Sequence, residues 1–166
     1  MKGSIEGCAA GACFDSDGLS LGEVVLIRSG KVENYHGSNR FGQYLGEKPT
    51  GNLGCICVEP GSFRMEPGNP CLEILAMSGL QVDFFNDYIG GEVRLAYYHD
   101  DEKRIPVTGI SVSGHLREVL NHMSLSQSTV VFDRYSGPDT VALSCMKIFE
   151  KCRIPRFRWN RGILLG

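Results

Sequence analysis

The stretch GGEVRLAYYHDDEKRIPVTGISV, residues 90–112, is the part of the sequence that most clearly indicates the fold. Val93, Leu95 and Tyr97 alternate with the residues between them, which is the period of two that is typical of a β-strand. A charged tip at residues 99–103 follows, and then a second run rich in β-branched side chains. The sequence therefore predicts an antiparallel pair of strands, joined by the charged tip.

Short apolar runs bounded by turn residues occur along most of the chain. The runs at residues 129–132 and 140–149 flank a turn at residues 135–139 and predict a terminal hairpin. The 21 glycines, about twice the usual share, favour frequent turns over long helices. Further strands are expected at residues 23–28, 32–35, 53–58 and 80–85.

Two segments have apolar residues at helical spacing. In residues 115–123 the apolar positions follow the 3, 4, 7 pattern of an amphipathic helix. Residues 71–79 also fit a short helix, with Asn69 as the cap and Gly79 at the exit. Residues 38–46 are expected to be a loop with one helical turn. The predicted fold class is α+β, predominantly β: an antiparallel β-rich domain with one or two short helices.

Length and composition indicate one globular domain. We expect this β-rich domain to span residues 1–150, and residues 151–166 to form a basic tail that is disordered or comes from an aberrant reading frame. No apolar run is long enough to span a membrane, and the first residues lack the apolar core of a signal peptide. A cytoplasmic protein without a membrane partner is therefore expected.

Charge is distributed unevenly along the chain. The tail holds five of the 17 basic residues and no acidic residue, which leaves 12 basic against 19 acidic residues in the first 150, a net charge of −7. Nucleic-acid binding depends on basic side chains that neutralise phosphates. An acidic body gives no reason to expect a nucleic-acid partner.

The order of several turn-and-strand motifs resembles the C-terminal domain of the TldD/PmbA family, the modulator-of-gyrase metallopeptidases. Each motif is common by itself, so the resemblance rests on their order and spacing between residues 13 and 149. The tail from Lys151 onward resembles nothing in that family. The matching segments are residues 14–18, 29–32, 59–62, 78–82 and 105–116.

The resemblance implies a β-rich subunit, often oligomeric, that serves peptide proteolysis. The family's catalytic motif is a helical His-Glu-x-x-x-His zinc site on the N-terminal side of the matched region, and this sequence has no such motif. Zinc is therefore expected in a partner subunit or in missing N-terminal sequence, with no cofactor in this chain. The expected partners are a peptide and either a TldD-like metal-bearing subunit or further copies of this chain.

Cysteines and histidines are the other candidate metal ligands. Seven cysteines are present without any CxxC pair, so we expect them to be reduced thiols in core positions. In TldD-type subunits a C-terminal cysteine completes the zinc site, and Cys145 is the nearest candidate by position. His115 and His122 lie seven residues apart, too far for one metal on a helix.

Three residues of the predicted strand pair are candidates for a peptide groove. Arg94, Tyr97 and Tyr98 could line such a groove, since strand edges bind extended peptides, and cross-strand packing is the simpler role for the two tyrosines. The sequence thus favours a non-catalytic subunit or fragment of a TldD/PmbA-type metallopeptidase system. The alternatives are a gyrase-modulator type of protein-binding module and an inactive fragment.

Overall fold

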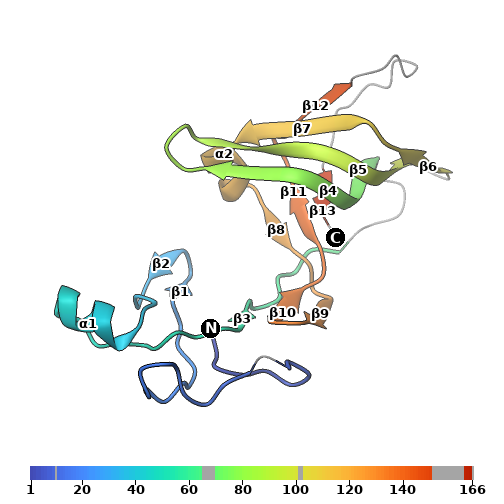
Figure 1. The fold of residues 1–166 in the computed structure, drawn as a ribbon. Coiled ribbons are helices and arrows are strands. Elements are labelled where there is room, and N and C mark those ends of the chain that lie inside the picture. The colour runs from blue at the N-terminus through green and yellow to red at the C-terminus, as the bar shows by residue number, and fades with distance from the viewer. Residues whose placement is uncertain (10, 65–69, 101–102, 151–162, 166) are drawn as a thin grey trace. The chain divides into compact units, whose positions relative to one another are not determined.

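The computed structural model describes residues 1–9, 11–64, 70–100, 103–150 and 163–165. They group into two compact units, one formed by Met1–Glu59 with Thr129–Gly137 and the other by Pro60–Ser128 with Pro138–Gly166 (Figure 1). None of the three boundaries between these units, after residues 59, 128 and 137, coincides with the domain boundary expected at residue 150. Strand is far more abundant than helix over the described residues, which confirms the predicted fold class.

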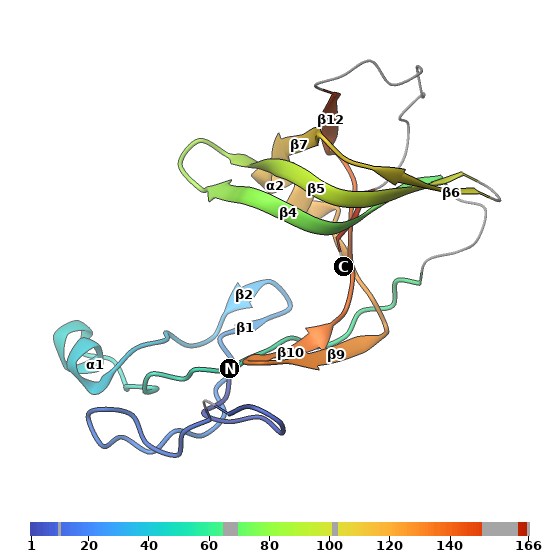
Figure 2. The ribbon, with the colours of Figure 1, turned by 45° about the vertical axis from the view of Figure 1, so that its right-hand side comes forward.

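The larger unit is organised around a long antiparallel hairpin. Its strands are β4 (Cys71–Asp83) and β5 (Tyr88–Asp100), each of 13 residues (Figure 2). The other edge of β5 pairs first with β7 (Ile110–His115) and then with β6 (Lys103–Val107), so the predicted antiparallel pairing is confirmed. Gly109 separates these two strands with a φ of 72°, a left-handed conformation that suits glycine.

The remaining strands extend this sheet on both sides. The order is β12-β7-β5-β4-β13-β11-β8, with β6 beside β5. The added strands are β8 (Ser124–Leu125), β11 (Val141–Leu143), β12 (Lys147–Glu150) and β13 (Ile163–Leu165).

Strand β13 lies in the part of the chain that was expected to be a disordered tail. It runs parallel to β4 and antiparallel to β11, and Ile163 is only 3% exposed. Disorder is therefore the wrong prediction for these three residues, because they bury an apolar side chain and gain strand pairing on both sides. The rest of the expected tail, residues 151–162 and 166, lies outside the described residues.

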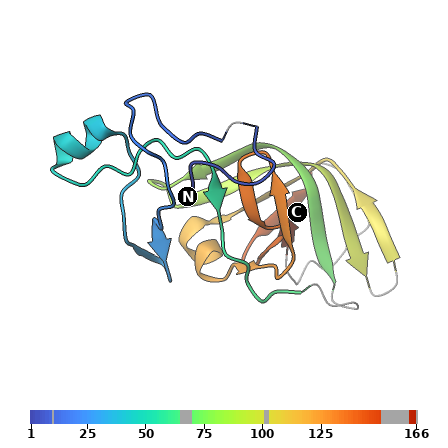
Figure 3. The ribbon, with the colours of Figure 1, turned by 90° about the horizontal axis from the view of Figure 1, so that it is seen from below.

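The core of this unit lies on one face of the sheet. Helix α2 (Leu116–Asn121) contributes to the buried interior through Leu116 and Val119, which confirms the helix predicted at residues 115–123. Figure 3 shows β4 and β5, in shades of green, side by side. The buried residues that pack together are Leu72, Ile74, Val93, Ala96, Ile110, Val112 and Ile163.

The helix predicted at residues 71–79 is wrong, because this segment is the first half of β4. Its apolar residues fit helical spacing, but Leu72 and Ile74 also alternate as strand residues do. They lie opposite Tyr98 and Ala96 of β5 and are buried in the core. Pairing with a neighbouring strand overrides the local helical preference.

The smaller unit contains short elements. Strands β1 (Ile27–Arg28) and β2 (Lys31–Val32) form a short antiparallel hairpin where strands were expected at residues 23–28 and 32–35. The one helical turn expected at residues 38–46 is helix α1 (Asn39–Leu45). Neither helix of the described residues is long and apolar enough to cross a membrane.

A three-stranded sheet of order β3-β10-β9 completes the smaller unit. It consists of β3 (Ile56–Cys57), β9 (Thr129–Phe132) and β10 (Tyr135–Pro138). The predicted terminal hairpin is therefore wrong. Strand β9 pairs with β10, whereas residues 140–149 supply β11 and β12 of the other sheet, because the turn that reverses β9 comes earlier than predicted, at Asp133 with φ of 49°.

A charged cluster holds β4, β5 and β6 together. Glu73 Oε2 lies 2.8 Å from His99 Nε2 and accepts a hydrogen bond of 3.0 Å from Arg104 Nη2. The guanidinium of Arg104 also lies 3.7 Å from the ring centroid of Tyr97. Burial raises the pKa of Glu73, but the hydrogen bonds from His99 and Arg104 outweigh it, and the pKa falls below 4.5.

Because the carboxylate of Glu73 is stabilised in the folded chain, Glu73→Gln should lower the free energy of unfolding at pH 7 by about 1 kcal/mol. The lowered pKa means that this contribution is present above pH 4.5 and is lost as the pH falls through the folded-state value. Urea unfolding at several pH values should show the difference shrinking in acid. The exposed control Glu47→Gln should match the unchanged chain, and a loss independent of pH would contradict this account.

Asp87, in the turn between β4 and β5, caps helix α2. Its backbone oxygen accepts a hydrogen bond of 3.1 Å from the N–H of Leu116, and its Oδ1 accepts one of 2.8 Å from the N–H of Arg117. The N-cap residue of the helix, His115, makes no capping hydrogen bond with its own side chain. Asp87 also has a φ of 52°, which aspartate and asparagine tolerate better than most residues.

Replacing Asp87 with alanine should destabilise the chain by about 1–2 kcal/mol, because the helix loses a cap and alanine disfavours a positive φ. The matched variant Asp87→Asn keeps an acceptor and tolerates the same backbone, so it should lose less. Urea unfolding midpoints measure both. Equal losses in the two variants would show that the negative charge beside His115, not the cap, matters.

Candidate functional site

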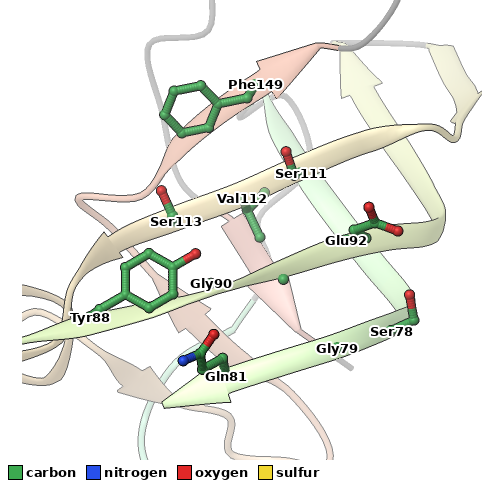
Figure 4. A pocket seen from close by; sticks show the side chains of 11 residues that line it. Ser78, Gly79, Gln81, Tyr88, Gly90, Glu92, Ser111, Val112, Ser113 and Phe149 are labelled. Atoms are coloured by element: carbon green, nitrogen blue, oxygen red, sulfur yellow. The ribbon is translucent and has the colours of Figure 1, made fainter. Parts of the chain in front are cut away.

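A groove of about 430 Å³ crosses the sheet of the larger unit on the face opposite the core. The face follows from alternation, since Ser111 and Ser113 flank the buried Val112 on β7. Figure 4 shows the side chains that line it. The lining residues belong to β4, β5, β7 and β12. They are Ser78, Gly79, Gln81, Tyr88, Gly90, Gly91, Glu92, Ser111, Val112, Ser113 and Phe149.

The lining side chains form two rows across the strands. In one row, Ser111 lies opposite Phe149 of β12 on one side and Glu92 of β5 on the other, and Glu92 lies opposite Ser78 of β4. In the second row, Gly90 lies between Ser113 and Gln81. Strand pairing alone therefore brings together residues from positions 78 to 149.

A β-bulge in β4 places both Ser78 and Gln81 on the groove. Residues three apart on a regular strand point to opposite faces. Here Ser78 pairs with Glu92 and Gln81 with Gly90, so three steps on β4 match two on β5, and Gly79 has a φ of 61°. Such a bulge redirects the side chains that follow it.

Gly90 keeps the floor of the groove open. A Cβ atom at this position would lie 2.5 Å from the hydroxyl of Tyr88 and 2.7 Å from the backbone oxygen of Val112. Any side chain would therefore displace the tyrosine and meet the backbone of β7. The glycine allows the Tyr88 ring to form one wall of the groove.

Charges of both signs lie at one end of the groove. Arg94 Nε donates a hydrogen bond of 2.8 Å to Ser78 Oγ, and its Nη2 lies 3.8 Å from Glu92 Oε2. Both charged side chains are about half exposed or more. A ligand in the groove can therefore reach a carboxylate and a guanidinium together with neutral hydroxyl groups.

The chemistry of the lining residues suits binding. Serine hydroxyls and the Gln81 amide donate and accept hydrogen bonds, and Tyr88 and Phe149 add apolar surface. A nucleophilic serine needs an adjacent base, and no histidine or lysine is among the lining residues. The groove has the means to hold a polar chain, and the carboxylate among its lining residues is that of Glu92, beside Arg94.

The structure separates the three residues predicted for a peptide groove. Arg94 lies at the end of the groove, Tyr97 lies under the guanidinium of Arg104, and Tyr98 packs against the core. Sequence reasoning missed Ser78, Gln81 and the two serines of β7. The only available signal was the Ser-Val-Ser alternation at residues 111–113, and the bulge that brings in the others leaves no such signal.

Cys145 lies between β11 and β12, exposed and with a φ of 66°. Among the described residues, no group of three or more His, Cys, Asp or Glu side chains could hold a metal ion. Each histidine has a local polar neighbour: Leu53 O for His36, Glu73 for His99, Asp87 for His115 and Glu118 O for His122.

Comparison with known proteins identifies one matching family model. No curated protein and no solved structure matches the chain. The family model described as the PmbA/TldA metallopeptidase C-terminal domain matches residues 2–158. This match is longer than the resemblance at residues 13–149, and it includes residues 151–158, which were expected to lie outside the family. The chain therefore belongs to the PmbA/TldA metallopeptidase C-terminal domain family.

Proposed function

We propose that this chain is a non-catalytic, peptide-binding part of a PmbA/TldA-type metallopeptidase system. The observation that carries the proposal is the groove on the outer face of the sheet, in a chain whose family is named for metallopeptidases. The groove offers hydrogen-bonding groups but no activated nucleophile among its lining residues. Binding of the substrate, with cleavage performed elsewhere, is the role that fits.

The lining groups match the chemistry of an extended peptide. A peptide backbone presents alternating N–H donors and C=O acceptors. The hydroxyls of Ser78, Ser111 and Ser113 and the amide of Gln81 can each pair with either kind of group. Because these contacts address the backbone, the groove should accept peptides of varied sequence, with Arg94 and Glu92 adding a preference for charged ends or side chains.

The metal centre is proposed to lie outside these 166 residues. A zinc peptidase site uses three protein ligands, an open position and a carboxylate base. The described residues lack a grouping of that kind. A metal-bearing family member carrying the His-Glu-x-x-x-His motif, or sequence N-terminal to this chain, would supply it, and the chain would associate with that part or with further copies of itself.

Filling the groove should weaken peptide binding. Ser111 lies between Phe149 and Glu92, so the ring introduced by Ser111→Tyr would occupy the middle of one row, and tyrosine is well tolerated in strands. Fluorescence anisotropy with a labelled tryptic digest of a denatured protein should show binding weakened about tenfold or more. The control Lys103→Tyr, on an exposed position of β6, should bind as the unchanged chain does. Equal peptide binding by the unchanged chain and both variants would show that the groove is not the peptide-binding site.

Association with a metal-bearing partner is a separate test. The purified chain should hold no stoichiometric zinc and should cleave no peptide by itself. Affinity capture should recover a family member that carries the His-Glu-x-x-x-His motif, and the mixture should cleave peptides. Stoichiometric zinc together with cleavage by this chain alone would overturn the non-catalytic role. Recovery of gyrase alone would favour the gyrase-modulator alternative.

A further inference from the structure

Two cysteines that lie 47 positions apart meet in the smaller unit. The Sγ atoms of Cys8 and Cys55 are 3.6 Å apart. Cys55 is fully buried, and its Sγ also lies 3.8 Å from the backbone oxygen of Gly3. Cys8 is partly exposed. The expectation that the cysteines fill core positions is wrong for Cys13 and Cys145, which are exposed, and holds for Cys55 and Cys71, which are buried.

Backbone hydrogen bonds hold the two cysteines in place. Lys2 and Cys55 exchange two hydrogen bonds, of 2.9 and 3.0 Å, which fix the N-terminal segment beside the start of β3. The N–H of Cys8 then donates to Ile5 O across a turn in which Gly7 has a φ of 79°. This turn brings the chain back over Cys55. The contact therefore follows from the path of the backbone as well as from the two side chains.

The remaining distance is small enough for a bond. A disulfide is about 2.0 Å long, so the two sulfur atoms need to approach by about 1.6 Å. A turn of the Cys8 side chain about its Cα–Cβ bond moves its sulfur by such an amount, and the partly exposed side of Cys8 leaves space for the movement.

We propose that Cys8 and Cys55 form a reversible intramolecular disulfide, a redox modification site whose oxidant is a low-molecular-weight disulfide such as oxidised glutathione. The bond closes a loop over residues 8–55 and ties the N-terminal segment covalently to the residue that precedes strand β3. In a reducing environment the two residues remain thiols, as in this structure.

The order of the two thiol–disulfide exchange steps follows from the different solvent exposure of Cys8 and Cys55. The thiolate of Cys8 attacks one sulfur of oxidised glutathione, the glutathione S–S bond breaks, and one glutathione leaves as a thiolate. Cys55 then attacks the Cys8 sulfur of this mixed disulfide, and its proton passes to the second glutathione, which leaves as a thiol. Two protein thiols are oxidised, and one glutathione disulfide is reduced to two glutathione thiols. Burial raises the pKa of Cys55, so the more exposed Cys8 is the thiol that reacts first.

Peptide mapping tests the pairing directly. The full chain is equilibrated with oxidised glutathione, its remaining thiols are alkylated, and a non-reducing digest is analysed by mass spectrometry. The expected result is a linked peptide pair containing Cys8 and Cys55, present in the control Cys57→Ser and absent from Cys8→Ser. A stable glutathione adduct on Cys8, or links distributed among Cys13, Cys57 and Cys145, would overturn the proposal.

Thermal unfolding gives a second measurement that does not depend on a variant of the buried Cys55. A disulfide across a loop of this length lowers the conformational entropy of the unfolded chain. The oxidised protein should therefore unfold several degrees above the reduced protein. Cys8→Ser, changed at a partly exposed position, should show the same midpoint with and without oxidant. An unchanged midpoint in the oxidised original chain would contradict the proposal.

Discussion

The antiparallel ladder between β4 and β5 is the constraint on which the larger unit depends. The two strands extend over residues 71–83 and 88–100, and every other strand of this sheet except β8 pairs with one of them or with a strand that does. Strand β8 joins the sheet through β11. Strand β5 has β4 on one side and both β6 and β7 on the other. The ladder also presents Leu72, Ile74 and Val93 to the core, so backbone pairing and apolar burial stabilise the same register.

The irregularities of this ladder produce the candidate site. A regular β4 would turn either Ser78 or Gln81 toward the core, where an unpaired polar group is costly. The bulge at Gly79 lets both face the groove, and Gly90 leaves the floor open beneath Tyr88. The features that interrupt the regular sheet are thus the ones that give it a ligand-binding face. Bulges and strand glycines have this use in many sheets.

The smaller unit is stabilised in a different way, by backbone and carboxylate hydrogen bonds between segments with little strand structure. Asp15 Oδ1 accepts from the N–H groups of Asp17 and Leu19, and its Oδ2 accepts from Asn52. The hydrogen bond from Leu19 contributes most to lowering the pKa of Asp15. The acidic turn that resembles the family motif therefore joins two distant parts of the chain, as the pair of Cys8 and Cys55 does nearby.

The β-rich class, the strand pair of residues 92–112, helix α2 and the family could be predicted from the sequence, because alternation, helical spacing and turn residues can be recognised along the chain. Tertiary contacts were needed to establish that residues 71–79 form a strand, that β9 pairs with β10, and which residues share the groove. Arg94 was predicted as a groove residue because it lies in the strand pair that residues 90–112 predict. The other polar residues of the groove were not, since a bulge and pairing across three strand boundaries depend on contacts between segments that are distant in the sequence.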